Sequence, residues 1–444
     1  MSNGYDYRNK VISNEDALAK IKSNDLVISA MAGAEPKIIL EHLHTIADRV
    51  RNVAVATCLP LHNAKWYTDP AMKGHFIHQA WFYTANARKA ADLGYGTCTC
   101  LPCQLHSAGH DLLKSRKPNV FLGTCTPPDR FGFVSLSLSA AYERELMEAA
   151  DIVILEMNEQ MPWTYGDTIV HLDTVDYVVE NNYAPPLFPV VESDDRDRRI
   201  GGYIAEQIED GSSIQIGIGG IPNAVTRELL HKKGLSIHTE MFTDGMIDLY
   251  EAGAIAKSAP DSDPRMLAGK MVATFALGTQ RLYDFIDHNP AVAIMRGSWV
   301  NDPYVIRHNK KQVSINTTLE IDLTGQVCSE SIGHKQFSGS GGQGDTAVGA
   351  QMAEGGKSFI ALYSTAEVKQ PDGTRKTVSK IAPMLAAGAV VTLHRAFVDY
   401  VVTEYGIVRL KGIPVNERAR ALISIAHPDF RASLTEEAEK LGFL

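Results

Sequence analysis

The chain has 444 residues, which is enough for two or three domains of ordinary size. Apolar residues make up 45% of the sequence and charged residues 21%, a balance typical of globular proteins with large cores and not of disordered chains. The 43 Lys and Arg residues against 52 Asp and Glu residues leave a net charge of −9, so the sequence lacks the positive field that nucleic-acid binding needs. We therefore expect no nucleic-acid partner.

The N-terminal stretch and the distribution of apolar residues predict a cytoplasmic protein with no membrane partner. Residues 1–20 are polar and charged where a secretory signal carries an apolar core. Uncharged apolar stretches such as Ala291–Met295 and Met384–Val391 are much shorter than the roughly 20 residues of a membrane-spanning helix. The six cysteines do not form the pattern of a disulfide framework, so we expect reduced thiols.

Two pairs of similar segments indicate an internal duplication. Residues 25–43 (DLVISAMAGAEPKIILEHL) predict a strand, a small-residue turn and a helix, and residues 212–230 (SSIQIGIGGIPNAVTRELL) repeat that order. The second pair is VDYVVE at 175–180 and VDYVVTE at 398–404. Because the two pairs occur in the same order along the chain, we predict two related α/β domains.

The predicted domains cover residues 1–188 and 189–444, joined by the proline-rich and acidic stretch APPLFPVVESDDRD. Short β-branched runs alternate with helical patterns in both, which predicts mostly parallel sheets flanked by helices. One of the predicted strands is GAVVTLHR at 388–395, just before the second VDYVV segment. Ligands of such sheets bind beyond the carboxyl ends of the strands, where the glycine-rich loops fall.

The first glycine-rich loop, GIGGI, consists of Gly217, Ile218, Gly219, Gly220 and Ile221. A dinucleotide fingerprint requires glycine three residues after Gly219, where this sequence has Pro222, and this weakens a nicotinamide-dependent interpretation. Pro222 is favourable at a first helical position, so we predict a helix whose free amides can accept an anion or a developing oxyanion. A tight turn that binds nothing remains an alternative.

The second glycine-rich segment, SGSGGQGD at 338–345, contains Gly339, Gly341 and Gly342 and precedes Lys357. Each glycine would cost about 1 kcal/mol in a helix, so their density indicates a backbone kept clear for a close approach. A flexible surface loop is the alternative, because such loops also accumulate glycine and serine.

Glu240 follows an apolar strand pattern and precedes a helix-like run, which predicts a position at a strand end on the same edge. A single glutamate is ordinarily solvated or ion-paired. Near two amide-rich loops, however, its carboxylate could act as a nucleophile. An acyl thioester would suit that nucleophile, because its carbonyl is electrophilic and its thiolate leaves readily.

These segments, together with SINTTLEIDLTGQV at 314–327 and VVTEYGIVRLKG at 401–412, resemble the acetyl-CoA hydrolase/transferase family of class I CoA-transferases. The resemblance covers nearly the whole chain and is closest to butyryl-CoA:acetate and 4-hydroxybutyrate CoA-transferases. It implies two open α/β domains of the CoA-transferase type, CoA as a substrate, no tightly bound cofactor, and a homo-oligomer, either a dimer or a tetramer.

The resemblance also implies roles for individual residues. Glu240 would attack the acyl-CoA, form an acyl-glutamyl anhydride and then carry CoA as a glutamyl thioester until a small carboxylate such as acetate takes it, in ping-pong order. The remaining implied site residues form the oxyanion and CoA-binding groups: Gly217, Ile218, Gly219, Gly220, Ile221, Asn316, Gly339, Gly341, Gly342 and Lys357.

Alternatives stay open at this point. Water in place of the carboxylate would give an acyl-CoA hydrolase, and a dinucleotide-dependent oxidoreductase and a non-catalytic CoA-binding regulator are more distant possibilities. The acyl group could be butyryl, 4-hydroxybutyryl or itaconyl. Cys98, Cys100 and Cys103 with His106 depart from the family pattern, and we expect them to pack near an acyl pocket and to hold no metal.

Overall fold

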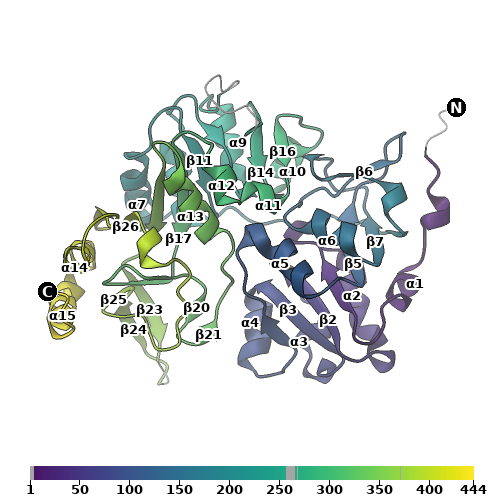
Figure 1. Cartoon of the computed structure of the whole chain (residues 1–444), viewed down its shortest axis with the longest axis horizontal. Coiled ribbons are helices and arrows are strands. Elements are labelled where there is room, and N and C mark those ends of the chain that lie inside the picture. Colours follow the sequence, from purple (N-terminus) through teal and green to yellow (C-terminus); the bar gives the residue numbers. More distant parts are fainter. Residues whose placement is uncertain (1–4, 257–265, 268, 371) are drawn as a thin grey trace.

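Two mainly parallel sheets organise the chain, one in each half (Figure 1). The computed structural model describes residues 5–256, 266, 267, 269–370 and 372–444. The N-terminal sheet has seven strands in the order β10-β7-β5-β1-β2-β3-β4, and each neighbouring pair is parallel. Its strands are β1 Leu26–Ser29, β2 Val53–Cys58, β3 Phe76–Phe82, β4 Cys98–Cys100, β5 Val120–Cys125, β7 Ile152–Met157 and β10 Tyr177–Glu180.

The C-terminal sheet has six strands in the order β12-β11-β17-β22-β26-β27. All neighbours are parallel except β27, which runs antiparallel to β26. Its strands are β11 Ser213–Ile216, β12 Ser236–Ile237, β17 Gln312–Thr317, β22 Lys357–Ala361, β26 Tyr400–Thr403 and β27 Gly406–Arg409.

The strand orders confirm two related α/β domains. The run β10-β7-β5-β1-β2 in the first sheet corresponds to β26-β22-β17-β11-β12 in the second. The duplicated segments of the sequence occupy equivalent strands in these runs, since β1 matches β11 and β10 matches β26. In Figure 1 the purple-to-blue N-terminal domain and the green-to-yellow C-terminal domain lie side by side.

Helices flank both sheets, and in the described part of the chain none is long and apolar enough to cross a bilayer. The N-terminal domain carries α1 Asn14–Ala19, α2 Lys37–His42, α3 Lys65–Thr68, α4 Ala85–Asp92, α5 Ala108–Ser115 and α6 Glu143–Ala149. The C-terminal domain carries α7 Asp195–Ala205, α8 Gly220–Glu228, α9 Asp244–Glu251, α10 Gln280–Ile286, α11 Gly297–Val300, α12 Pro303–Ile306, α13 Gln343–Met352, α14 Val415–Ser424 and α15 Pro428–Lys440.

The two domains share structure as well as a boundary. The strand β8 (Tyr165–Gly166), from the first half of the sequence, pairs with β16 (Val292–Ile294), which pairs in turn with β14 (Met271–Ala273). One apolar core cluster contains Ile28 of the first sheet and Ile315 of the second. The remaining short strands are β6 Phe133–Ser135, β9 Ile169–His171, β13 Met241–Phe242, β15 Phe275–Ala276, β18 Glu320–Asp322, β19 Val327–Cys328, β20 Ser331–Ile332, β21 Lys335–Gln336, β23 Thr365–Lys369, β24 Arg375–Ser379 and β25 Ile381–Ala382.

The predicted strand at 388–395 is wrong. Within that segment only Leu393 forms an isolated bridge, to Val327, and the side chains of Val390 and Val391 are exposed. The position beside β26 belongs to β22, whose apolar residues are buried against neighbours on both sides. The apolar run at 388–395 was therefore not sufficient evidence for a strand of the sheet.

Candidate active site

Glu240 lies in the turn between β12 and β13, beyond the carboxyl end of the C-terminal sheet. Its carbonyl oxygen accepts hydrogen bonds from the backbone N–H groups of Thr274 at 2.9 Å and Phe275 at 3.2 Å, which fixes this turn. The hydroxyl of the preceding Thr239 donates to the carbonyl of Ile216, the last residue of β11, at 3.5 Å. The residue before Glu240 therefore contacts the end of β11, and the first glycine loop begins directly after that strand.

The second glycine loop contacts the Glu240 carboxylate through the main chain of Gly341 and Gly342, and we call this contact the carboxylate seat. A Cβ atom at Gly342 would lie 1.9 Å from Oε2 of Glu240, so only glycine leaves room for the carboxylate. The backbone of Gly342 also donates a hydrogen bond to it. Gly341 has φ of 55°, a conformation that favours glycine, and its Cβ position lies 3.8 Å from Oε1 of Glu240. These glycines bring the main chain onto the carboxylate.

The same loop is docked on the N-terminal domain. A Cβ atom at Gly339 would lie 1.9 Å from the carbonyl oxygen of Trp81, and the carbonyl of Gly341 accepts a hydrogen bond from the N–H of Leu105 at 3.1 Å. The position of the Glu240 seat therefore depends on residues from the first half of the sequence.

Asn301 is the principal side-chain partner of Glu240, and the motifs in the sequence did not reveal it. It is fully buried at the C-terminal end of α11, and its Nδ2 donates to Oε2 of Glu240 at 2.8 Å. Its own Oδ1 has no hydrogen-bond partner within the described residues. An unpaired buried acceptor costs roughly 1–3 kcal/mol, and such groups are concentrated at functional sites.

The first glycine loop leads from β11 into α8. The helix begins at Gly220, with Gly219 as its N-cap at φ of 120°. Pro222 is the third helical residue, two places later than predicted, but it still lies in the first turn, where its missing N–H costs no hydrogen bond. A Cβ atom at Gly220 would lie 2.3 Å from Oδ2 of Asp197, so this glycine allows α7 and α8 to approach closely.

Asn316 lies near the carboxyl end of β17, as expected for a residue close to the site. Its Nδ2 donates to the hydroxyls of Ser314 at 2.9 Å and Thr346 at 3.1 Å. Thr346 belongs to the first turn of α13, which starts directly after Gly342. Asn316 is therefore held against the helix that carries the second glycine loop.

Lys357 lies at the opposite end of the C-terminal sheet from Glu240. It is the first residue of β22, at the amino end of the sheet, where its Nζ donates to the carbonyl of Gln207 at 2.7 Å and pairs with Glu209 at 3.4 Å. The carboxyl edge carries a different lysine, Lys380, whose Nζ donates to the carbonyl of Thr318 at 3.2 Å. Burial lowers the pKa of Lys380 to about 8.

Burial dominates the electrostatics of Glu240. The pKa of its carboxyl is raised from 4.5 to about 7, and loss of solvent is the main cause. The negative charge of Asp345 also raises this pKa, whereas the hydrogen bonds from Asn301 and Gly342 lower it. Near neutral pH the carboxyl group of Glu240 is therefore partly ionised. Its anionic form is available as a nucleophile and is not strongly stabilised by its surroundings.

The cysteine cluster is a set of partly buried thiols. Burial raises the pKa values of Cys98 and Cys100, both on β4, to about 11. Burial likewise raises the pKa of Cys103. In the described parts of the chain, no three His, Cys, Asp or Glu side chains are grouped so as to hold a metal ion.

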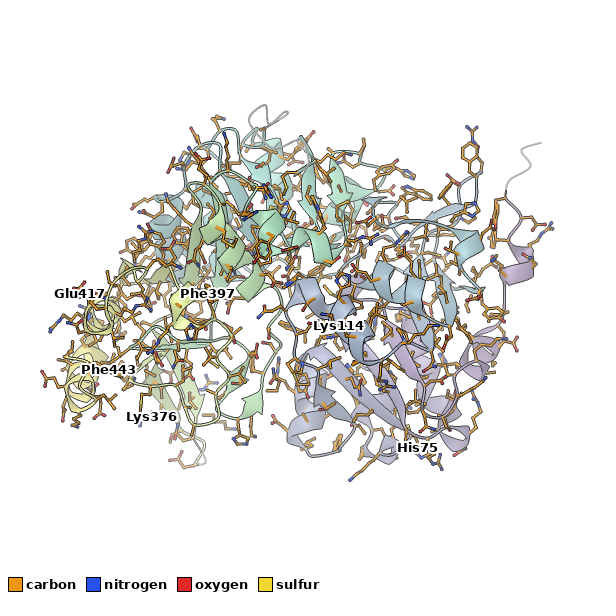
Figure 2. All side chains as sticks on the ribbon, viewed as in Figure 1. His75, Lys114, Lys376, Phe397, Glu417 and Phe443 are labelled. Carbon is orange, nitrogen blue, oxygen red and sulfur yellow. The ribbon has the colours of Figure 1, made fainter. Side chains whose placement is uncertain are left out.

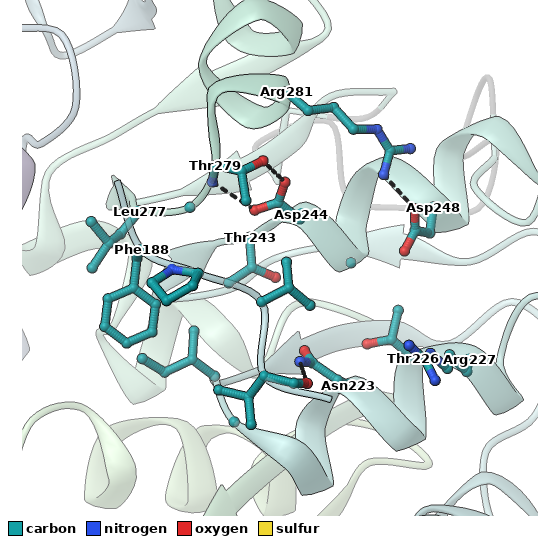
Figure 3. A pocket seen from close by; sticks show the side chains of 17 residues that line it. Phe188, Asn223, Thr226, Arg227, Thr243, Asp244, Asp248, Leu277, Thr279 and Arg281 are labelled. Atoms are coloured by element: carbon teal, nitrogen blue, oxygen red, sulfur yellow. Dashed lines mark hydrogen bonds and ion pairs between the residues drawn. The ribbon is translucent and has the colours of Figure 1, made fainter. Parts of the chain in front are cut away.

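A separate hollow of about 280 Å³ opens beside the first glycine loop (Figure 3). Ile218 lines it together with Asn223, which donates to the carbonyl of Val191 at 2.8 Å and ties the interdomain stretch to α8. At the polar side, Asp244 accepts a hydrogen bond from the N–H of Thr279 at 3.0 Å. Glu240 is not among the lining residues, so this hollow is distinct from the carboxylate seat.

Comparison with protein-family models gives two matches that together span both domains. The acetyl-CoA hydrolase/transferase N-terminal domain matches residues 1–192, and the acetyl-CoA hydrolase/transferase C-terminal domain matches residues 278–438. The chain belongs to the acetyl-CoA hydrolase/transferase family. The family membership confirms the resemblance seen in the sequence.

Similar proteins match over almost the whole chain. A succinyl-CoA:cyclohexane-1-carboxylate CoA transferase of Geobacter metallireducens is 41% identical and covers 98% of this chain and 97% of its own. A 4-hydroxybutyrate coenzyme A transferase of Clostridium kluyveri is 41% identical with 98% of each chain covered. An acetyl-CoA hydrolase of Eremothecium gossypii is 26% identical and covers 70% of this chain and 63% of its own.

Solved structures agree with this assignment. RipA from Yersinia pestis is 32% identical, with a TM-score of 0.88 over 99% of both chains. The 4-hydroxybutyrate CoA-transferase from Porphyromonas gingivalis is 31% identical, with a TM-score of 0.76 over 98% of both chains.

The raised pKa of Glu240 predicts a pH-dependent cost to folding. Since its pKa is about 7 in the native state against a usual value of 4.5, the unfolded chain loses this proton first, and native stability falls as pH rises between these values. We expect Glu240→Gln to raise the melting temperature relative to the wild type by an amount that is small at pH 4.5, grows to about pH 7 and then levels off. The matched control is Glu228→Gln on the exposed side of α8. A difference that does not change with pH would contradict the burial of this charge.

Proposed function

We propose that this chain is a CoA-transferase that moves CoA between a short-chain acyl-CoA and a small carboxylate such as acetate, in ping-pong order through a CoA thioester on Glu240. The observation that carries the proposal is the seating of one carboxylate, at the carboxyl edge of the sheet, against the main chain of Gly342 and the amide of Asn301. The family membership and the similarity to proteins named as CoA transferases support it.

The first half of the reaction uses Glu240 as the nucleophile. An oxygen of its carboxylate attacks the thioester carbonyl, the C–S bond breaks, and an acyl-glutamyl anhydride and free CoA thiolate result. The developing oxyanion needs N–H donors. The first turn of α8, beginning at Gly219 and Gly220, supplies amides that have no partner within the helix.

The second half transfers CoA to the enzyme. The thiolate attacks the glutamyl carbonyl of the anhydride, so the original acyl group leaves as a carboxylate and Glu240 holds CoA as a thioester. A second carboxylate then reverses both steps. Since thioester and anhydride are both activated acyl groups, no external energy source or redox group is required, and the protein contributes positioning and amide donors.

The rival functions have less support. A hydrolase would use water in place of the second carboxylate, but the relatives with that name match less of this chain at lower identity. A dinucleotide-dependent oxidoreductase is disfavoured because Pro222 lies in the first turn of α8 where a dinucleotide motif needs glycine. Homo-oligomeric assembly and a cytoplasmic location stay predictions.

A coupled assay distinguishes transfer from hydrolysis. Purified protein is mixed with butyryl-CoA in the presence and absence of acetate, and acetyl-CoA and free CoA are both measured. We expect acetyl-CoA to form in proportion to butyryl-CoA consumed, with little free CoA when acetate is absent. Equal release of free CoA under both conditions would replace the transferase proposal with a hydrolase.

The seat of Glu240 predicts a specific sensitivity at Gly342. Because the added methyl group of Gly342→Ala would lie 1.9 Å from Oε2 of Glu240, the carboxylate must move, and we expect acyl-CoA turnover to fall by about 100-fold or more. The displaced atoms are ends of side chains, so the protein should still fold, as its melting curve would show. The control is Gly202→Ala on α7, where an added Cβ meets no atom within 4 Å. Unimpaired turnover in Gly342→Ala would refute this geometry.

A further inference from the structure

His106 and Asp345 form a pair across the domain boundary. His106 belongs to the N-terminal domain, in the short helical turn Leu105–Ser107, and its Nδ1 lies 2.7 Å from Oδ1 of Asp345. The backbone N–H of the same histidine donates to Oδ2 of Asp345 at 3.0 Å. Asp345 is 2% exposed, whereas a third of the His106 side chain is open to solvent. The histidine is therefore the solvent-facing partner of a buried carboxylate.

Asp345 connects this pair to the reactive group. It lies in the first turn of α13, three residues after Gly342, whose main chain seats the Glu240 carboxylate. Asn301 hydrogen-bonds to Asp345 as well as to Glu240, so one buried amide contacts both carboxylates. The mechanism proposed above uses neither Asp345 nor His106.

We propose, building on the CoA-transferase function, that His106 is a positioning residue that sets the charge state of Glu240 by holding and neutralising Asp345. With an imidazolium at position 106, the pair is neutral and Glu240 is free to ionise. With a neutral imidazole there, Asp345 presents an uncompensated negative charge to Glu240 inside a poorly solvated site.

This arrangement has a chemical consequence, because Glu240 changes charge during the proposed reaction. The free carboxylate is negative, whereas its anhydride and its thioester are neutral. A negative Asp345 nearby therefore favours the covalent states over the free carboxylate, and a neutralised pair favours the ionised nucleophile. The charge of His106 therefore shifts the balance between the ionised Glu240 carboxylate and its neutral covalent states, although His106 does not touch the reacting atoms.

Other charged groups surround the pair and act in the same direction. Asp111 of α5 and Asp302 beyond α11 add to the effect of Asp345 in raising the pKa of His106. They line with His106 a hollow of about 510 Å³, which also contains His110 and Lys114 and which lets the imidazole exchange protons with solvent. Figure 2 labels Lys114, and its helix α5 lies at the boundary between the domains in Figure 1.

Next to the buried partners lie two thiols. The charge of Asp345 contributes to the raised pKa of Cys103, and the charge of Glu240 contributes to that of Cys58. Both thiols stay protonated and neutral at neutral pH. Among the described residues, Asp345 is the charged side chain that shifts the pKa of Glu240, and His106 acts on Glu240 through it.

The experiment measures the ionisation of Glu240 without relying on turnover. In the wild type, His106→Gln, Asp345→Asn and the double variant, the melting temperature is compared with and without Glu240→Gln between pH 4 and pH 9. The pH at the midpoint of the growth in that difference lies halfway between the pKa values of Glu240 in the unfolded and native states, so it moves by half of any change in the native pKa. Gln at position 106 can still donate to Asp345 but carries no charge, and His110→Gln, an exposed histidine of the same hollow, is the matched control.

We expect His106→Gln to raise the native pKa of Glu240 by about one unit, which moves the midpoint upward by about half a pH unit, and Asp345→Asn to move it downward by a similar amount. The double variant should match Asp345→Asn, since the histidine acts through the aspartate, and His110→Gln should match the wild type. The acid limb of kcat/KM for CoA transfer should shift in the same directions.

A midpoint that His106→Gln leaves unchanged, or moves downward with Asp345→Asn, would overturn the proposal. If the midpoints shift in opposite directions while the protein transfers no CoA, the coupling stands and the proposed function fails. If CoA transfer is intact and the midpoints do not respond, the function stands and the role of His106 fails.

Discussion

The site depends on one close contact between a carboxylate and a main chain. Oε2 of Glu240 occupies the place where any side chain at position 342 would begin, and Nδ2 of Asn301 contacts the same oxygen. This contact requires the turn after β12, the end of α11 and the loop before α13 to meet at one point. It also requires the N-terminal domain, because Trp81 and Leu105 hold that loop in place.

The same contact governs the chemistry. A carboxylate that is partly shielded from water and accepts hydrogen bonds from Asn301 and Gly342 keeps a pKa near neutrality, so it is available as a nucleophile and is not overstabilised as an anion. The covalent states proposed for it are neutral, and burial favours neutral groups. A low-dielectric seat therefore favours the very intermediates that acyl exchange requires, with amide donors in place of a metal or a redox cofactor.

Short sequence patterns predicted site residues that lie within one recognisable segment, and they missed the contacts between residues that are far apart in the sequence. Glu240 lies in a turn between two short strands, and Gly342 and the Gly217–Ile221 loop lie on strand-to-helix connections, so their strand patterns and glycines are visible in any short window. Asn301 acts across a large sequence separation, and nothing in its immediate neighbours marks it. Asp345 ends the second glycine-rich segment, but its partner His106 lies 239 residues earlier, so no short window shows the pair. Lys357 shows the converse error, because its motif is recognisable but parallel strand order places it at the opposite end of β22.

Mass spectrometry of the wild-type protein, quenched during turnover with butyryl-CoA and digested to peptides, tests directly whether Glu240 is the nucleophile. We expect the peptide containing Glu240 to carry CoA in thioester linkage, and borohydride to convert that glutamate to the corresponding alcohol. An unmodified Glu240 in protein that is demonstrably turning over, or CoA attached at another side chain, would contradict it.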